Sequence, residues 1–231
     1  MARNVTLLSL RTQSRLRADK ANSGYILDAE LNQYINNSAT ELYDLLVGAY
    51  GNDYYMKTYT FSVNNTDREY PLPSDFYKLE GIDLYINPSR FITLKPFMFN
   101  ERGRYQDGSN WAAIVAIQGP RYHIKNNVVE FNPSPPGAYN LNMYYVPELP
   151  EMVNDTDTFD GINGWEEYII VDAAIKMLQK EESDVSVLMA QKAALIKRIN
   201  TMAENRDIGH PFVVNDVQRD WNDASGDVYR Y

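Results

Sequence analysis

The sequence predicts an α+β protein: N- and C-terminal helices form a helical bundle, a central antiparallel β-rich insertion separates them, and an extended C-terminal arm follows. Apolar residues recur at helical spacing near both ends of the chain, in residues 28–48 and 165–202. Between residues 56 and 150 they alternate instead with polar residues, as in strands. After Glu204 the periodicity is lost. The predicted divisions are N-terminal helices in 1–55, a β-rich domain in 56–150, a C-terminal helical hairpin in 151–204 that completes the helical body, and the arm in 205–231.

Two helices are expected in the N-terminal part. The first covers residues 5–18. The second begins at Asp28, whose carboxylate can accept the free N–H groups of a first helical turn, and Gly48 can close it in the left-handed conformation. The apolar stripe of the second helix consists of Leu31, Tyr34, Ile35, Ser38, Leu42, Leu45 and Leu46.

The central region begins with a half-buried strand, because Tyr59, Phe61 and Val63 alternate with small polar residues. A turn follows at residues 64–67. Residues 70–76 return the chain with two prolines, which cannot donate to a central ladder, so this segment is expected at a sheet edge. A tight hairpin is expected at residues 125–127, and a helical turn in the connection 97–111. Further strands are predicted at residues 81–85, 90–94, 113–118, 121–124, 128–131 and 140–146.

Helical spacing resumes at Trp165. Glu166 and Glu167 fall in the first turn, where carboxylates favour the positive end of the helix dipole. Asp184 can cap a last helix, and the short connection 181–183 predicts an antiparallel helical hairpin. The expected apolar positions of the two helices are Tyr168, Val171, Ala174, Ile175 and Leu178, then Leu188, Leu195, Ile196, Ile199 and Met202.

The final segment keeps large apolar side chains in a polar background. Such anchors are typical of an arm that becomes ordered on a partner, since a few large side chains must offset the ordering entropy. An ordinary flexible terminus is the alternative. The predicted binding residues of this arm are Ile208, Phe212, Val213, Val214, Val217, Trp221, Val228, Tyr229 and Tyr231.

Composition excludes several kinds of site. The chain has no cysteine and two histidines, so thiolate chemistry and histidine-rich metal sites are ruled out. Twenty-two basic against 31 acidic side chains give a net charge of −9, which argues against a general nucleic-acid coat. Negative charge is compatible with a surface that DNA passes without binding. The start of the chain lacks the apolar core of a signal peptide, and no apolar run approaches the roughly 20 residues that span a bilayer.

No motif for catalysis, cofactor binding or metal binding is convincing. Residues 155–161 resemble a calcium loop, but Phe159 occupies the fifth ligand position and the glycine is one place late. Glu166 and Glu167 point about 100° apart on a helix and cannot easily share a substrate. His123 is expected to be structural. A basic cluster of Lys192, Lys197 and Arg198 is expected on a solvated helix face, with nucleic-acid contact as the less favoured reading.

The order of several segments resembles the head-to-tail adaptor (connector) proteins of short-tailed double-stranded DNA bacteriophages. The matching pieces are DAELNQYINNSATELYDLL, the doublet Tyr54-Tyr55, YPLPSDFYKLEGIDLY, NPSPPGAYNLNMYYVPELP and the closing helices. They span about residues 5–204.

The resemblance implies a ring, usually of twelve copies, beneath the portal protein in the virion neck, between capsid and tail. The protein itself would be made in the host cytoplasm. The ring would extend the channel through which genomic DNA passes without specific binding, and would carry the tail nozzle or tail-tube protein. It implies a ring wall formed by residues 28–46 and 165–204, a β region that faces the tail, and a C-terminal extension that reaches into the portal. From the sequence itself, no membrane partner and no cofactor are expected.

Two alternatives stay open. Eighteen tyrosines, together with Trp111, could form the platform of a glycan-binding module or glycan hydrolase, although a hydrolase would need two converging carboxylates and no convincing pair is present. The chain could also be another neck or tail-tube protein of the virion.

Overall fold

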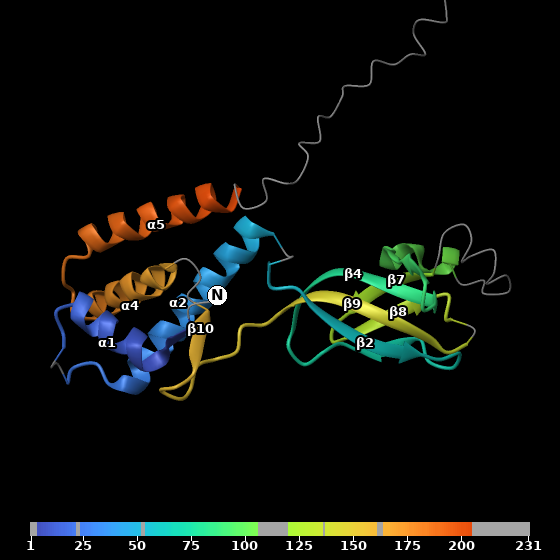
Figure 1. The fold of residues 1–231 in the computed structure, drawn as a ribbon, viewed down its shortest axis with the longest axis horizontal. Helices are drawn as coiled ribbons and strands as arrows, with labels where there is room; N and C mark the ends of the chain where they lie inside the picture. The colour runs from blue at the N-terminus through green and yellow to red at the C-terminus, as the bar shows by residue number, and fades with distance from the viewer. Residues whose placement is uncertain are drawn as a thin grey trace, which may run out of the picture.

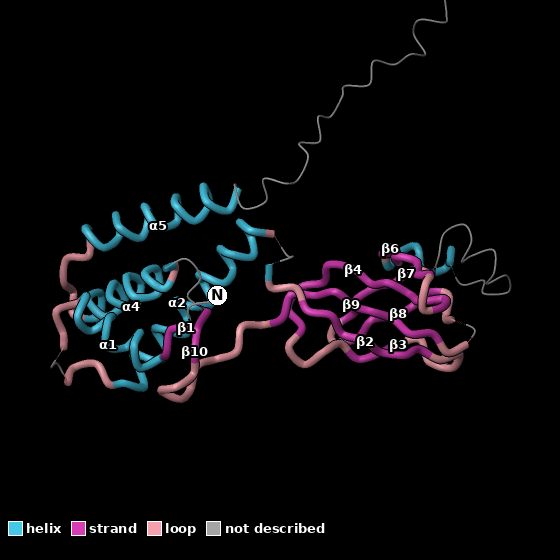
Figure 2. Tube along the Cα trace, in the orientation of Figure 1, coloured by secondary structure: helices cyan, strands magenta, loops and turns pink. Residues whose placement is uncertain are grey.

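The computed structural model describes residues 4–21, 24–51, 54–105, 120–135, 137–160 and 164–204. These residues form a helical lobe and a β lobe that lie end to end (Figure 1). The helical lobe contains segments from both ends of the chain, and the β lobe contains the middle (Figure 2). The predicted α+β class, with helices flanking a β-rich central region, is therefore confirmed.

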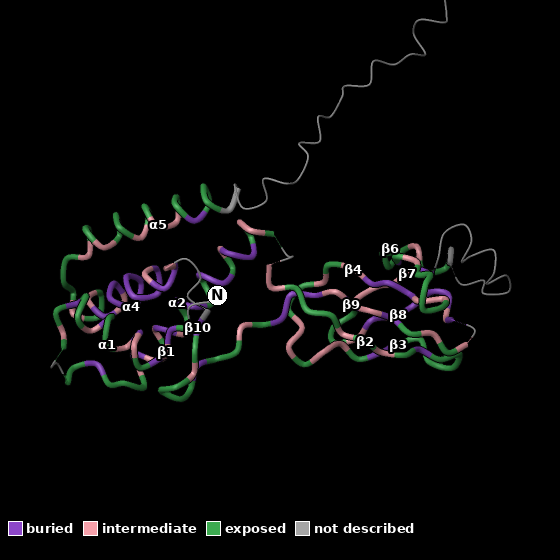
Figure 3. The backbone as a smooth tube through the Cα atoms, in the orientation of Figure 1, coloured by how far each residue is buried: buried purple, intermediate pink, exposed green. Residues whose placement is uncertain are grey.

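The helical lobe is organised around one central helix, α4, which packs against the other three helices. Ten of its fifteen residues are buried, and Figure 3 shows it as the most deeply buried helix of this lobe. The predicted apolar stripe was too narrow, because Ile169, Ile170 and Ala173 on the other faces are buried too. The elements of this lobe are α1 (Leu7–Arg17), α2 (Asp28–Tyr50), α4 (Glu166–Lys180), α5 (Ser186–Glu204) and the antiparallel strands β1 (Asn4–Thr6) and β10 (Thr158–Asp160).

The start of the first helix differs from the prediction. Asn4–Thr6 is the strand β1, which pairs with β10. The helix begins after Thr6, whose backbone is extended and whose hydroxyl accepts the amide hydrogen of Ser9 at 3.2 Å. Thr6 therefore caps the helix, which the apolar spacing alone did not reveal.

The second helix begins at Asp28 as predicted, but the predicted capping role of Asp28 and the predicted end at Gly48 were wrong. Leu27 occupies the N-cap position without a side-chain capping bond, and Asp28 lies inside the first turn. The Asp28 carboxylate instead pairs with Arg11 and Arg15. At the other end α2 runs past Gly48 to Tyr50 and stops at Gly51, which has a φ of 81°.

The β lobe consists of two four-stranded sheets, ordered β2-β9-β4-β5 and β3-β8-β7-β6, that share one apolar core. All neighbouring strands are antiparallel except β6 and β7. Ile82 and Leu84 of β4, Leu141 and Met143 of β9, and Phe131 of β8 are fully buried. The strands are β2 (Lys57–Val63), β3 (Glu69–Pro71), β4 (Phe76–Asn87), β5 (Arg90–Thr93), β6 (Lys95–Pro96), β7 (Arg121–Lys125), β8 (Val128–Asn132) and β9 (Tyr139–Pro147).

Most strand predictions are confirmed with shifted ends. The proline-containing return is the edge strand β3, and Asn126 closes the predicted hairpin with a φ of 53°. A 3₁₀ helix at Phe99–Tyr105 supplies the helical turn that was expected in the connection. The predicted strand at residues 113–118 and Trp111 lie outside the described residues.

A small aromatic junction connects the two lobes. Tyr43 and Val47 of α2 pack on Val146 at the end of β9, and the buried Tyr43 hydroxyl donates to the Pro147 carbonyl at 2.6 Å. Burial raises the pKa of Tyr43 to about 12, so this hydroxyl stays protonated and keeps donating. The Tyr77 hydroxyl adds a bond to the Asp44 carboxylate at 2.9 Å.

Candidate assembly surfaces

Three helices of the helical lobe are tied together by a group of ion pairs, which we call the ionic node: Ser38 and Glu41 from α2, Asp172 and Lys176 from α4, and Lys192 from α5. The Lys192 ammonium lies 2.6 Å from one Asp172 oxygen and 3.0 Å from Glu41. Lys176 lies 2.7 Å from the other Asp172 oxygen and 3.1 Å from Glu41. Ser38 also donates to Asp172 at 2.7 Å. Two lysines and two carboxylates balance, so the node carries no net charge.

The protonation states of the node follow from its geometry. Burial alone would raise the pKa of Asp172, but hydrogen bonds from Lys176, Lys192 and Ser38 outweigh it and hold that pKa below its ordinary value. Burial alone would lower the pKa of Lys192, and its hydrogen bonds to Asp172 and Glu41 raise it instead. Against the effect of burial, hydrogen bonds from the two lysines also hold the pKa of Glu41 below its ordinary value, so Asp172, Glu41 and Lys192 are ionised near neutral pH.

The predicted basic cluster on α5 does not form one surface. Lys192 points inward and belongs to the ionic node. The Arg198 guanidinium lies 4.9 Å from the centre of the Trp165 ring, and Lys197 is exposed. The prediction of a common solvated face was wrong because the buried Asp172 carboxylate pairs with Lys192 and compensates the cost of burying its charge.

Helix α5 is the least covered helix of the described part. Among residues 186–202 only Ile199 is buried, and Leu188, Lys192, Leu195 and Ile196 are half-buried. The side chain of Met202, one of the expected apolar positions, is 47% exposed. Val187 and Met189 are also exposed. In Figure 3 the helix is mostly green along its outer side, so α5 has an apolar surface that no described residue covers.

Helix α1 offers a second exposed apolar surface. Leu8 and Leu16 lie two turns apart, with exposed fractions of 50% and 62%. The opposite side of the helix faces the core, where Leu7, Leu10 and Ser14 are buried. Two arginines next to Leu8 also tie the helix to the lobe, because Arg11 pairs with Asp155 at 2.7 Å and Arg15 pairs with Asp28 at 2.9 Å. The two apolar surfaces belong to two different helices, and Figure 1 shows α4 between these helices.

The acidic groups considered for chemistry have structural roles. Glu166 is buried, and Glu167 pairs with Arg17. The Asp157 carboxylate accepts the amide hydrogens of Asn154 and Val153, which lowers its pKa and closes a turn. Within the described segments, no group of histidine, aspartate and glutamate side chains is arranged to hold a metal ion.

His123 packs against aromatic rings in the β lobe. Its ring centre lies 5.4 Å from that of Phe97 and 6.1 Å from that of Phe99. No carboxylate is paired with it in any interaction found within the described segments. This packing agrees with the expected structural role.

The predicted partner-binding residues of the arm lie outside the described residues. The ionic node was not predicted from the sequence. Its signal was Asp172 followed four residues later by Lys176 inside an apolar helical stretch, since a carboxylate in such a position needs an opposite charge.

The described residues thus define a two-lobed α+β protein whose surfaces are its candidate sites of function. None of the described helices combines the length and apolarity needed to cross a membrane. A family model for the SU10 adaptor protein matches residues 5–223, and the chain therefore belongs to the SU10 adaptor protein family, a family of structural adaptor proteins of bacteriophages. No curated protein matches the chain.

Proposed function

We propose that this phage adaptor protein acts at the junction between head and tail. Copies assemble into a ring of twelve beneath the portal protein, extend the channel through which the genomic DNA passes, and form the platform on which the tail nozzle or tail-tube protein docks. The protein is made in the host cytoplasm and becomes part of the virion neck. Membership of the family and the order of the matched sequence segments support this proposal.

The observation that carries the ring is the position of two exposed apolar surfaces on the helical lobe. Leu8 and Leu16 lie on α1, and Val187 and Met189 lie on α5, with α4 between the two helices (Figure 1). An interface between two different surfaces of the same chain generates a ring when the rotation between copies closes. We therefore propose that α5 of one copy contacts α1 of the next, with residues 28–46 and 165–204 as the ring wall.

The remaining parts receive their roles from the same arrangement. The β lobe points away from the helical lobe and would meet the tail. The arm, residues 205–231, would bind the portal through the apolar and aromatic residues named for it in the sequence. The net charge of −9 suits a channel that DNA passes without specific binding, because like charges repel.

Binding of purified full-length protein to purified portal rings tests the arm. We expect the double substitution Phe212→Ala and Trp221→Ala to weaken binding by at least about 100-fold, since aromatic anchors dominate protein interfaces. The matched control, Arg219→Ala and Asp220→Ala, removes two charges from the same segment and should change binding by less than about fivefold. Equal effects of the two variants would refute the proposed role of the arm.

A further inference from the structure

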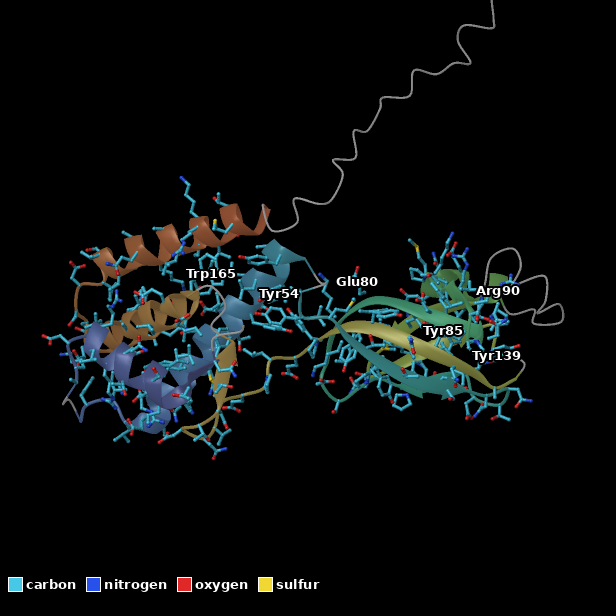
Figure 4. All side chains as sticks on the ribbon, in the orientation of Figure 1. Tyr54, Glu80, Tyr85, Arg90, Tyr139 and Trp165 are labelled. Atoms are coloured by element: carbon cyan, nitrogen blue, oxygen red, sulfur yellow. The ribbon has the colours of Figure 1, made fainter. Side chains whose placement is uncertain are left out.

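We infer that the outer end of the β lobe contains a binding site for neutral glycans. A cavity of about 530 Å³ lies there, formed by β2, β4, β9 and the turns beside them. Tyr85 and Tyr139, which line it, lie at the end of the lobe remote from the helices (Figure 4). The volume falls within the range of about 300–1,000 Å³ typical of small-molecule sites, and is large enough for a short oligosaccharide.

The strand register explains why polar groups collect at this place. Alternate residues of a strand point to opposite faces, so Leu141 and Met143 enter the core while Asn140 and Asn142 point outward. Asn142 lies opposite Thr60 on one side, and Asn140 lies opposite Tyr85 on the other. The result is a row of amides and hydroxyls beside an aromatic ring.

The hydrogen bonds inside the cavity leave donors facing outward. The Asn140 side-chain oxygen accepts from Ser62 at 2.8 Å, and that of Asn87 accepts from the Ser89 backbone at 3.0 Å. The Asn142 oxygen accepts from Thr60 at 2.8 Å. No described residue accepts a hydrogen bond from the amide nitrogens of Asn140 or Asn87. The site thus presents N–H donors in fixed positions, which are complementary to a ligand rich in oxygen acceptors.

The lining selects a neutral sugar among acceptor-rich ligands. It contains no charged side chain, so nothing in it would compensate an anion or a cation. The rings of Tyr85 and Tyr139 provide flat surfaces on which the C–H face of a pyranose can pack. The Tyr85 ring is held by Phe91, with the ring centres 5.6 Å apart, which limits the entropy lost on binding.

Binding rather than hydrolysis follows from the same residues. A glycan hydrolase uses two carboxyl groups about 5–9.5 Å apart, and no carboxylate lines this cavity. Asp83, which lies opposite Asn142 on the neighbouring strand, is buried, and its carboxylate accepts a hydrogen bond from Thr93 at 2.7 Å. The site would therefore attach the protein to a polysaccharide and leave the polysaccharide intact, an activity separate from the proposed adaptor function.

Titration of the isotopically labelled full-length chain with maltohexaose, cellohexaose and hexa-N-acetylchitohexaose, followed by amide NMR spectra, tests the inference. We expect at least one of these neutral glycans to shift the signals of residues 85–88 and 138–142. The variant Asn140→Asp keeps the acceptor for Ser62 and replaces the N–H donors by an oxygen, so binding should weaken roughly tenfold. Asn200→Asp on the exposed side of α5 makes the same charge change elsewhere and should bind like the unmodified protein.

Each glycan is added to about 10 mM, which is ten times the dissociation constant of a weak, millimolar complex. If none of the three glycans shifts the signals of the cavity residues at this concentration, the inference is overturned. Equal binding by Asn140→Asp and the unmodified protein would also overturn it. If Asn140→Asp instead abolished binding to a tail protein while no glycan bound, the cavity would belong to a protein interface. Ring assembly on the portal is measured separately, so either proposal can fail without the other.

Discussion

The ionic node should hold α5 on the helical lobe, and the substitution Lys192→Met tests this. Methionine has a side chain of similar length, but it loses the ion pairs with Asp172 at 2.6 Å and Glu41 at 3.0 Å and the contact of the ammonium with the Tyr168 ring. Removal of one partner from a fully buried pair costs about 3–5 kcal/mol. The cost here should be smaller, because the Lys192 side chain is 25% exposed and Asp172 keeps Lys176 and Ser38.

We therefore expect Lys192→Met to lower the free energy of unfolding by about 2 kcal/mol, a change of about 30-fold in the folding equilibrium. Urea unfolding followed by circular dichroism gives this number. The control Lys197→Met removes the same charge from the exposed side of the same helix and should cost less than about 0.5 kcal/mol. Equal costs for the two variants would refute the claim that the node anchors α5.

Three further predictions concern pH, the lobe junction and the ring. The folded-state pKa of Asp172 lies below its ordinary value of 3.8, so its stabilising contribution is present above that value and is lost as the pH falls through the lower folded-state pKa. Asp172→Asn should therefore reduce the dependence of the unfolding free energy on pH below about pH 4, and an unchanged pH profile would contradict this. Tyr43→Phe removes the buried hydrogen bond to the Pro147 carbonyl and should lower the free energy of unfolding in urea by about 1–2 kcal/mol. Tyr77 is exposed, so Tyr77→Phe should lower it by less than about 0.5 kcal/mol. A larger loss for Tyr77→Phe than for Tyr43→Phe would contradict the role of Tyr43 in joining the two lobes. Leu16→Glu should weaken ring assembly at least tenfold in sedimentation experiments without lowering monomer stability. The control Gln13→Glu, on the same helix, should assemble normally. Normal assembly of Leu16→Glu would show that α1 is not part of the interface.

The periodicity of the sequence was sufficient for the α+β class and for most helices and strands. It placed the strand that begins the β lobe and the edge position of the proline-containing segment, because strand alternation and the missing proline N–H are local properties. Helix ends were less predictable. The first helix begins at Leu7 rather than at residue 5, with Thr6 as its cap. Asp28 pairs with arginines from α1, and only the tertiary arrangement brings these groups together.

The surfaces were harder to predict than the fold. A stripe of apolar residues on α5 suggested a buried face, but the helix packs against only part of the lobe, and Met202 remains exposed. Lys192 looked like one of three solvated bases, although Asp172 on the neighbouring helix draws it inward. Both errors have one cause: helical spacing shows which residues share a face, and the neighbouring helices decide which face is covered.

The measurement closest to the central proposal is the mass of the full-length protein, determined alone and after mixing with purified portal rings. We predict that the mixture contains a complex in which a closed ring of about twelve copies is bound to each portal ring, whether the free protein is monomeric or already a ring. A protein that stays monomeric and never associates with portal rings, at concentrations where its helical lobe is folded, would contradict the adaptor function proposed here.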